Sequence, residues 1–181
     1  IDRSLRFNRA DSAYLSRTPS SAGNRRTWTW SGWVKRNKLG TEQQLIRANQ
    51  GGTSTSNATD FYFGTDDKLH AYTNISNSIQ FNKVTSAVYR DVGAWMHVML
   101  VVNVPDIDIY INGVEVEDWS TNTEGSNYDT WVNSTEPHLI GRNLTNGSAY
   151  ADYQLADVHF IDGQALAATD FGEFDEDTGV W

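Results

Sequence analysis

Two short groups of carboxylates occupy alternate positions along the chain, so in a β-strand each group would point to one face. A retaining glycosidase holds two carboxyl groups about 5–5.5 Å apart, and alternate residues of a β-strand point to one face. Glu115 and Glu117 have this spacing, as do Glu173, Asp175 and Asp177. The pair follows an Asn-Gly turn, where we expect a solvated strand edge, and the triplet lies in a terminal acidic run rather than in a central strand. We therefore predict no glycosidase activity.

The histidines give no better support for a hydrolase. The four histidines are scattered along the chain, and no Gly-x-Ser-x-Gly sequence is present. The absence of cysteine excludes thiolate chemistry. We expect His97 to be a packed, hydrogen-bonded side chain. Asp157 and His159 share one strand face and could hold a cation, although simple pairing or exposure is the favoured interpretation. We predict that the protein is not an enzyme.

Several acidic residues could bind calcium. A hard cation takes oxygen ligands from carboxylates, amides and backbone carbonyls. The candidate ligands stand in loops or at strand ends and are Asp60, Asp66, Asp67, Asn74, Asp152 and Asp157. No Asp-x-Asp-x-Asp-Gly loop is present, so the sequence does not specify a site. Calcium is the one cofactor that we consider, as a hypothesis.

Aromatic and amide side chains could instead form a glycan site. Such a site needs an aromatic platform for the apolar sugar face and polar groups for the hydroxyls. The candidates are Trp119, Tyr128, Trp131, Arg142, Asn143 and Tyr150. They would meet if the loop 118–137 folds beside the loop 143–150. The alternative is that the aromatics plug the end of the fold or lie in an oligomer interface.

Short β-strands must position these side chains. The segment 27–36 carries aromatic bulk on both faces, and the segment 96–104 is apolar at nearly every residue, which is typical of strands covered on both sides. Ile107, Ile109 and Ile111 alternate with polar residues, and Asn112-Gly113 then predicts a tight hairpin turn.

Together these patterns predict an all-β, antiparallel two-sheet jelly-roll sandwich of about a dozen strands with almost no helix. The best helical candidate is a single turn over 167–171. We find no internal repeat, and we expect one domain over residues 1–181. Because the sequence starts without methionine, we interpret it as an excised or processed piece of a longer chain, with a mature protein after cleavage as the alternative.

The charge balance limits the partners. The chain has 181 residues and a formal net charge of −9, from 23 acidic and 14 basic residues. A negative field argues against binding to nucleic acid phosphates. The negative field is compatible with binding of a cation or a neutral glycan. Alternatively, the charge serves only to keep the protein soluble. No run of apolar residues is long enough to predict membrane insertion.

Five groups of segments, in order along the chain, carry a family resemblance. They are Ser4-Leu-Arg-Phe-Asn8 with Ala13-Tyr-Leu15, Thr27-Trp-Thr-Trp-Ser-Gly-Trp-Val-Lys35, Ala94-Trp-Met-His-Val98 leading to Ile109-Tyr-Ile-Asn-Gly113, Leu139-Ile-Gly-Arg142, and Leu155-Ala-Asp-Val-His-Phe-Ile-Asp-Gly163 with Phe171-Gly172 and Gly179-Val-Trp181. Their ordered combination resembles the laminin-G-like branch of the concanavalin A-like lectin/glucanase superfamily. The ending from Phe160 onward resembles laminin-G-like domains in virion proteins of tailed phages, especially marine phages.

The resemblance implies a non-enzymatic recognition module of a tail fibre, tail tip or head appendage. Such a module would lie on the surface of the virion and bind a host cell-surface glycan through rim loops. Calcium at a sandwich rim is also implied, because many laminin-G-like domains bind it there. The alternative is a structural attachment or decoration module that contacts other virion proteins, for example as a homotrimer. A glycoside hydrolase is the third and least favoured interpretation.

Overall fold

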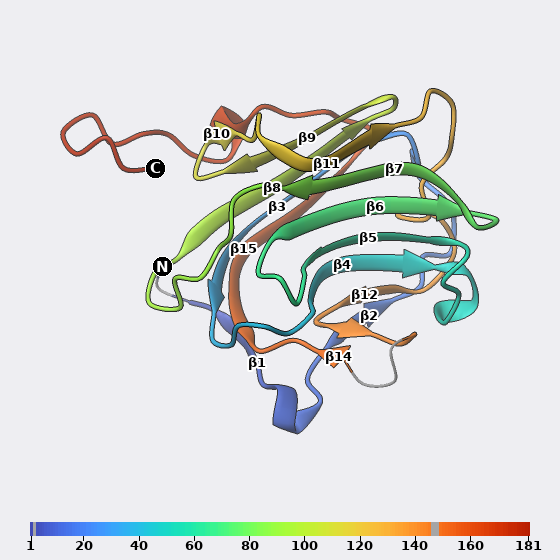
Figure 1. Ribbon diagram of the computed structural model, residues 1–181, viewed down its shortest axis with the longest axis horizontal. Helices are drawn as coiled ribbons and strands as arrows, with labels where there is room; N and C mark the ends of the chain where they lie inside the picture. The colour runs from blue at the N-terminus through green and yellow to red at the C-terminus, as the bar shows by residue number, and fades with distance from the viewer. Residues whose placement is uncertain (2, 146–148) are drawn as a thin grey trace.

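Two antiparallel β-sheets lie face to face and enclose the core (Figure 1). A computed structural model describes residues 1, 3–145 and 149–181. The first sheet has six strands, in the order β1 (Leu5–Phe7), β15 (Tyr153–Asp162), β3 (Thr27–Arg36), β8 (Met96–Asn103), β9 (Asp106–Ile111) and β10 (Val114–Glu115). The second has seven, in the order β11 (Trp119–Glu124), β7 (Ser78–Thr85), β6 (Leu69–Ile75), β5 (Ala58–Phe63), β4 (Gln43–Asn49), β12 (His138–Ile140) and β2 (Leu15–Arg17).

The remaining regular structure is small. β13 (Arg142–Asn143) pairs with β14 (Ala149–Tyr150). The described residues also form three single 3₁₀ turns, η1 (Arg9–Asp11), η2 (Gln50–Gly52) and η3 (Ala168–Asp170). None of the helices in the described part of the chain is long and apolar enough to cross a membrane. The predicted all-β jelly-roll sandwich with almost no helix is therefore confirmed.

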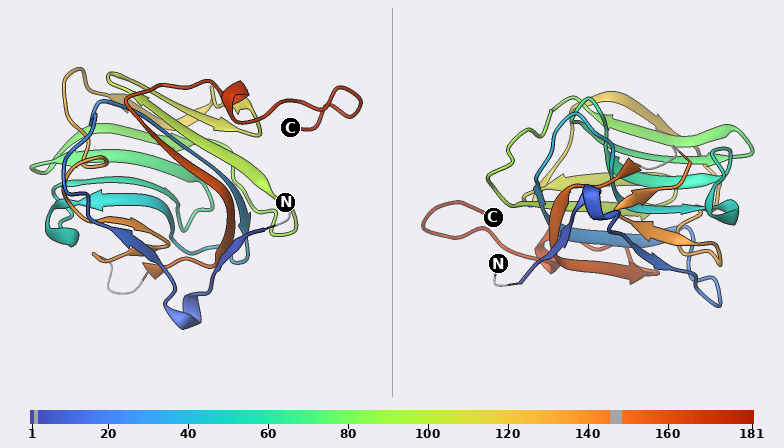
Figure 2. Two further views of the ribbon diagram at one scale, coloured as in Figure 1. Left: turned by 180° about the vertical axis from the view of Figure 1, so that it is seen from behind. Right: turned by 90° about the horizontal axis from the view of Figure 1, so that it is seen from below.

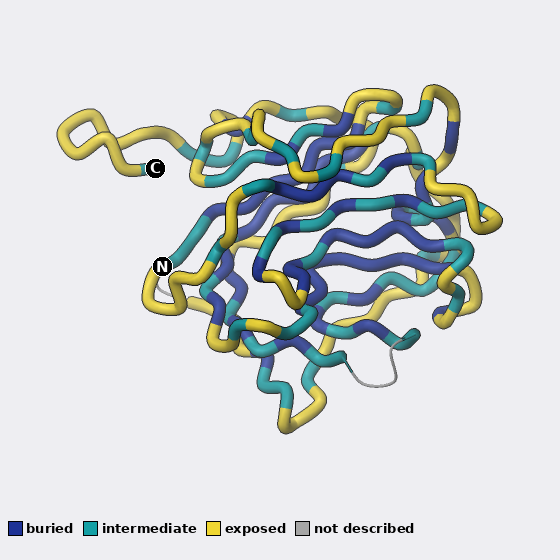
Figure 3. Tube along the Cα trace, viewed as in Figure 1, coloured by how far each residue is buried: buried dark blue, intermediate teal, exposed yellow. Residues whose placement is uncertain are grey.

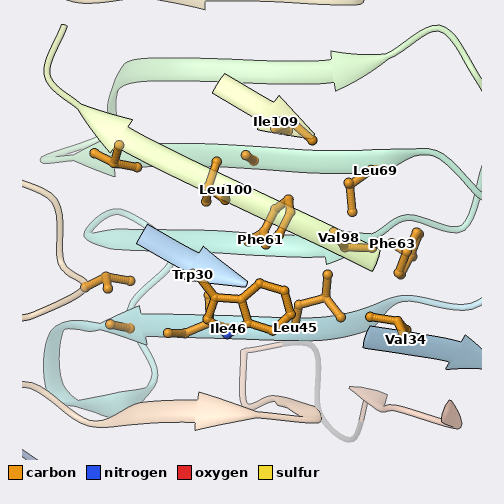
Figure 4. Close-up of a cluster of buried hydrophobic side chains, with 14 of the residues drawn as sticks. Trp30, Val34, Leu45, Ile46, Phe61, Phe63, Leu69, Val98, Leu100 and Ile109 are labelled. Carbon is orange, nitrogen blue, oxygen red and sulfur yellow. The ribbon is translucent and has the colours of Figure 1, made fainter. Parts of the chain in front are cut away.

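The strand β3 shows why the sheets adopt this arrangement. Trp28, Trp30 and Val34 are fully buried on its inward face, as the two-residue periodicity predicts. Trp30 packs edge to face on Phe61 of the other sheet, with ring centroids 5.6 Å apart. Figure 4 shows this contact within the core, and Figure 3 shows the buried residues concentrated in the central strands.

The strand β8 is apolar at nearly every residue because both of its faces are packed against other parts of the protein. Val98, Leu100 and Val102 point into the main core. Met99 and Val101 point the other way and pack with the C-terminal segment, which includes Ala168, Phe171 and Trp181. Both views of Figure 2 show this segment running along the six-stranded sheet and then turning away from it.

The predicted hairpin joins β9 and β10. Asn112 and Gly113 have φ values of 49° and 77°, which the tight turn requires and which asparagine and glycine tolerate. Val114 pairs with Ile111 directly after the turn. Glu115 ends the short strand β10 and is exposed, like Glu117.

Candidate functional site

The three aromatic residues of the predicted glycan platform do not form one. Tyr128 is only 4% exposed and packs against Phe81 in the core, with ring centroids 6.0 Å apart. Trp131 is partly buried, and its indole Nε1 donates to the Asn74 carbonyl at 3.2 Å. Trp119 begins β11, an edge strand, where the Lys83 ammonium lies 4.8 Å from its ring. The platform prediction is corrected, and the alternative of aromatics that close the sandwich describes Tyr128 and Trp131.

The reason is that 118–137 is not a free loop. Its first part forms β11, and Tyr128, Thr130 and Val132 are buried in alternation against the core. Thr130 accepts a hydrogen bond from the buried Trp28 Nε1 at 3.0 Å. Although this segment is polar in overall composition, its alternate residues face the interior, where they are apolar or hydrogen-bonded.

The other three predicted glycan residues lie near one another but face different surroundings. Arg142 pairs with Tyr150 across β13 and β14, and its guanidinium lies 4.8 Å and 5.0 Å from the rings of Tyr14 and Tyr150. Asn143 is buried and donates to Glu42 Oε1. Residues 146–148 of this predicted loop lie outside the described residues.

Two of the predicted calcium ligands are held by cationic or imidazole partners. Asp67 is buried and binds Arg36 Nη2 at 2.9 Å and Arg90 Nε at 3.1 Å. Burial tends to raise the pKa of Asp67, but hydrogen bonds from the Gly40 amide and these arginines lower it overall. Asp66 lies 2.9 Å from His70 Nε2 at the surface.

The other predicted ligands are equally separate. Asp152 accepts from the Asn37 amide at 3.4 Å, and Asp157 is exposed at a bulge with φ 46°. Asn74 donates to the Thr55 carbonyl at 3.1 Å. Among the described residues, no group of three or more His, Asp or Glu side chains is placed to hold a metal ion. The set predicted from the sequence therefore does not form one site, and calcium binding stays a prediction.

Asp60, the remaining predicted ligand, belongs to a polar pocket on the outward face of the seven-stranded sheet. In β5, Phe61 and Phe63 point into the core, so Asp60 and Tyr62 point outward. The strand register aligns Arg47 of β4 with Asp60, and Asp60 with Tyr72 of β6. The pocket has a volume of about 140 Å³ and is lined by Glu42, Gln44, Arg47, Thr55, Asp60, Tyr62, Tyr72, Asn143 and Thr145.

A buried ion pair forms the base of this pocket. Arg47 Nη1 donates to Asp60 Oδ1, and the two residues are 1% and 0% exposed. Arg47 Nη2 also donates to the Ser54 carbonyl and the Thr145 hydroxyl, both at 3.3 Å. Burial raises the pKa of Asp60, although the guanidinium and the nearby Tyr72 hydroxyl act to lower it.

Hydrogen-bonding capacity remains at this base. Gln44 Oε1, Arg47 Nε and Asp60 Oδ2 are buried without a hydrogen bond of regular geometry to any described residue. Buried polar atoms of native proteins are nearly always paired with protein, water or ligand. The Tyr72 hydroxyl already interacts with the Asp60 carboxylate, so Gln44 Oε1 and Arg47 Nε are the groups that require a polar partner at this pocket, either water or a ligand.

Two tyrosines give the pocket its aromatic walls. Tyr62 stacks on His70 at a centroid distance of 4.9 Å and meets Tyr72 edge to face at 6.4 Å. Burial and then the Asp60 carboxylate raise the pKa of both phenols well above the ordinary value, so both hydroxyls stay protonated at neutral pH. The arrangement can bind a small polar ligand that has an apolar face.

Sequence reasoning selected only Asp60 and Asn143 from this pocket and missed Arg47, Tyr62 and Tyr72. One signal was present, because the segment 58–63 alternates and places Asp60 and Tyr62 opposite Phe61 and Phe63. The pairing of β4 with β5 that brings Arg47 to Asp60 is not encoded locally.

Comparison with known proteins assigns the chain to a family. The model of the Laminin_G_3 family, described as concanavalin A-like lectin/glucanases superfamily, matches residues 9–170. None of the curated proteins matches the chain. Similar solved structures include domains LG4-5 of the mouse laminin α1 chain, with 10% identity over 100% of this chain and 45% of that chain and a TM-score of 0.66.

Two further structures are similar in fold. Tailspike protein 2 of the Escherichia coli O157:H7 bacteriophage CAB120 is 13% identical over 93% of this chain and 23% of that chain, with a TM-score of 0.62. Domain 4 of the arabinanase AbnA from Geobacillus stearothermophilus, solved with arabinotriose, is 18% identical over 88% and 71%, with a TM-score of 0.61. The chain thus spans less than half of the laminin and tailspike chains. The family match and the two-sheet sandwich show that this chain belongs to the concanavalin A-like lectin/glucanases superfamily.

Proposed function

We propose that the chain is a non-enzymatic glycan-binding module and that one neutral sugar residue occupies the pocket at Arg47 and Asp60. The observation that carries this proposal is the buried ion pair beside the rings of Tyr62 and Tyr72. Sugars present hydroxyl groups at their edges and C–H groups on their faces. A site for them therefore combines fixed hydrogen-bonding groups with aromatic rings.

The size and charge of the pocket favour a single neutral residue. A volume of about 140 Å³ is small for a drug-sized ligand and accommodates about one sugar ring. Glu42 and Asp60 contribute two carboxylates against the one guanidinium of Arg47. Like charge disfavours a sialic or uronic acid at such a site.

We further propose that the module belongs to a phage virion appendage and binds a host cell-surface glycan. The resemblance of the ending from Phe160 to virion proteins supports this, as does the likeness in fold to a phage tailspike. The arabinanase domain was solved with arabinotriose, so a domain of similar fold accepts a short sugar chain.

Binding without hydrolysis is supported by the position of the carboxylates that have catalytic spacing. Glu115 and Glu117 are exposed beside the hairpin. Asp175 is exposed in the C-terminal segment and accepts hydrogen bonds from the Thr178 amide and hydroxyl. Neither group lines the pocket, where Asp60 is instead bound by Arg47.

A glycan array followed by calorimetric titration tests the proposal. We expect binding of a neutral glycan, a loss of about tenfold or more in Tyr62→Ala, and a smaller loss in Tyr72→Phe. Tyr110→Phe, on the other sheet, is the matched control and retains affinity. Trp119→Ala, outside the pocket, should also bind normally.

Other outcomes would replace the proposal. Release of reducing ends from a bound glycan would indicate hydrolysis, with Glu42 and Asp60 as the carboxylates that share the pocket. If no host polysaccharide binds and the purified domain is a stable oligomer, such as a trimer, the structural attachment role would be favoured instead.

A further inference from the structure

A second and larger cavity opens along the side of the sandwich. It has a volume of about 710 Å³ and is lined by Leu15, Ser16, Arg17, Pro19, Ser21, Ala22, Gly23, Ile46, Asn133, His138, Ile140, Phe160 and Asp162. We call it the side groove. Its walls are β2 from the seven-stranded sheet and the C-terminal half of β15 from the six-stranded sheet. It shares no lining residue with the sugar pocket.

The strand β15 is covered along only part of one edge. β3 pairs with it from Tyr153 to Asp162, across one bulge. On the opposite edge, β1 pairs only with Tyr153, Gln154 and Leu155. The bulge between Ala156 and His159 separates this covered part from residues 158–162, which have no strand partner on that side among the described residues.

The missing neighbour explains an unusual exposure. Phe160 pairs in register with Trp30, and its ring centroid lies 5.7 Å from that of Trp28, so its side chain points toward the interior. It is nevertheless 38% exposed. Leu15, on the facing wall, is 48% exposed. β2 is itself the terminal strand of its sheet, and within the described part of the chain it pairs with β12 alone. Two free backbone edges therefore border an apolar groove.

We propose that the side groove binds an extended peptide segment of a partner protein, which adds as a strand to residues 158–162 of β15. The backbone of such a peptide would pair with the open edge, and alternate side chains would enter the groove over Ile46, Ile140 and Phe160. A small apolar molecule would use the groove alone. The coincidence of groove and free edge favours an extended chain.

Charge at one end of the groove specifies the peptide further. Asp162 Oδ1 accepts hydrogen bonds from the Asn24 amide at 2.8 Å and Asn133 Nδ2 at 2.5 Å, and both donors are neutral. No ion pair involves Asp162 or Arg17 among the described residues. The segment would thus place a basic residue beside Asp162 and an acidic residue or carbonyl group beside Arg17, with apolar residues at alternate positions between them.

The probe is a displayed library of octapeptides with alternating apolar residues, selected on the purified domain. A peptide from it is then synthesised with and without N-methyl groups on the alternate residues that would pair with β15. We expect amide shifts concentrated at 158–162 in ¹⁵N spectra. The N-methyl groups should lower the affinity about tenfold or more, because they remove the paired N–H groups.

Two leucines of equal exposure provide the variant and its control. Leu15→Glu places a charge in the groove, whereas Leu5→Glu alters a residue that is 49% exposed on β1 and does not line it. We expect Leu15→Glu to lose binding and Leu5→Glu to keep it, with similar thermal stability in both. If the library selection enriches no peptide that binds the wild-type domain better than the Leu15→Glu variant, the proposal is wrong. Equal binding of the methylated peptide would also overturn it and would assign the groove to apolar ligands.

Discussion

Removing the Asp60 carboxylate is the sharpest perturbation of the sugar pocket. In Asp60→Ala, the Arg47 guanidinium would lose the carboxylate with which it forms its buried ion pair while it remains 1% exposed. Its remaining hydrogen bonds, to the Ser54 carbonyl and the Thr145 hydroxyl, are long at 3.3 Å and involve neutral acceptors. An uncompensated buried charge is therefore the main cost of this substitution.

The expected magnitude follows from that geometry. Breaking a buried ion pair by removing one partner costs about 3–5 kcal/mol. Because the pocket beside Arg47 has a volume of about 140 Å³, enough for water to enter, and two hydrogen bonds remain, we expect the lower end, about 3 kcal/mol. At about 2–4 °C per kcal/mol for a chain of this size, the melting temperature should fall by about 6–12 °C.

The double variant Arg47→Met, Asp60→Leu separates the charge from the packing. Replacing a buried pair by apolar side chains of similar volume is often neutral or stabilising. We therefore expect the double variant to recover most of the stability that Asp60→Ala loses, and still to bind no sugar. Thermal and urea unfolding of the wild type, Asp60→Ala and the double variant measure this. A cost below about 1 kcal/mol for Asp60→Ala, or a double variant that is no more stable, would refute the reasoning.

Three other substitutions test separate parts of the sandwich. Burial, and to a lesser extent His159, lowers the pKa of His97 to about 4, below about 6.5 in the unfolded chain. Stability should thus be full above pH 6.5 and fall toward pH 4 by at most about 1.4 kcal/mol per pH unit; urea midpoints of His97→Gln should lack this slope. Gly113→Ala adds a Cβ 2.1 Å from the Trp181 ring, at a backbone φ of 77°. Because the ring must then move, limited proteolysis should cut the displaced C-terminal segment faster than in the wild type. An unchanged cleavage rate would contradict this contact. Thr130→Val leaves the buried Trp28 Nε1 without its acceptor and should cost about 1–3 kcal/mol in urea unfolding, whereas Thr130→Ser should cost less.

The fold was predictable because its main signals are local. The two-residue alternation of β3 and β9 assigns each side chain to a face without knowledge of the partner strand. Asn112-Gly113 specifies a turn through the backbone angles of two adjacent residues. The apolar run of β8 indicated cover on both sides, and the C-terminal segment supplies the second cover.

The sugar pocket was not predictable in the same way, because its members come from separate strands. Arg47, Asp60 and Tyr72 meet only through the register of β4, β5 and β6. A lone carboxylate such as Asp60 can bind calcium or an arginine, and its sequence neighbours do not distinguish the two. The segment containing Tyr128 was predicted as an exposed loop from its polarity, although its alternate residues are buried.

Three different surfaces of the sandwich carry the pocket, the side groove and the C-terminal segment. The outward face of the seven-stranded sheet carries the pocket at Arg47 and Asp60, where we propose that a sugar binds, and the side between β2 and β15 carries the groove. The outward face of the six-stranded sheet is partly covered by the C-terminal segment through Phe171 and Trp181. A peptide in the side groove would therefore leave the pocket open, and a module that joins a partner to a glycan needs such independent sites. Sugar affinity measured with and without saturating peptide should be equal within about twofold, because neither site contributes a residue to the other. A larger change would show that β4 and β12, which run between the pocket and the groove, transmit a shift between them.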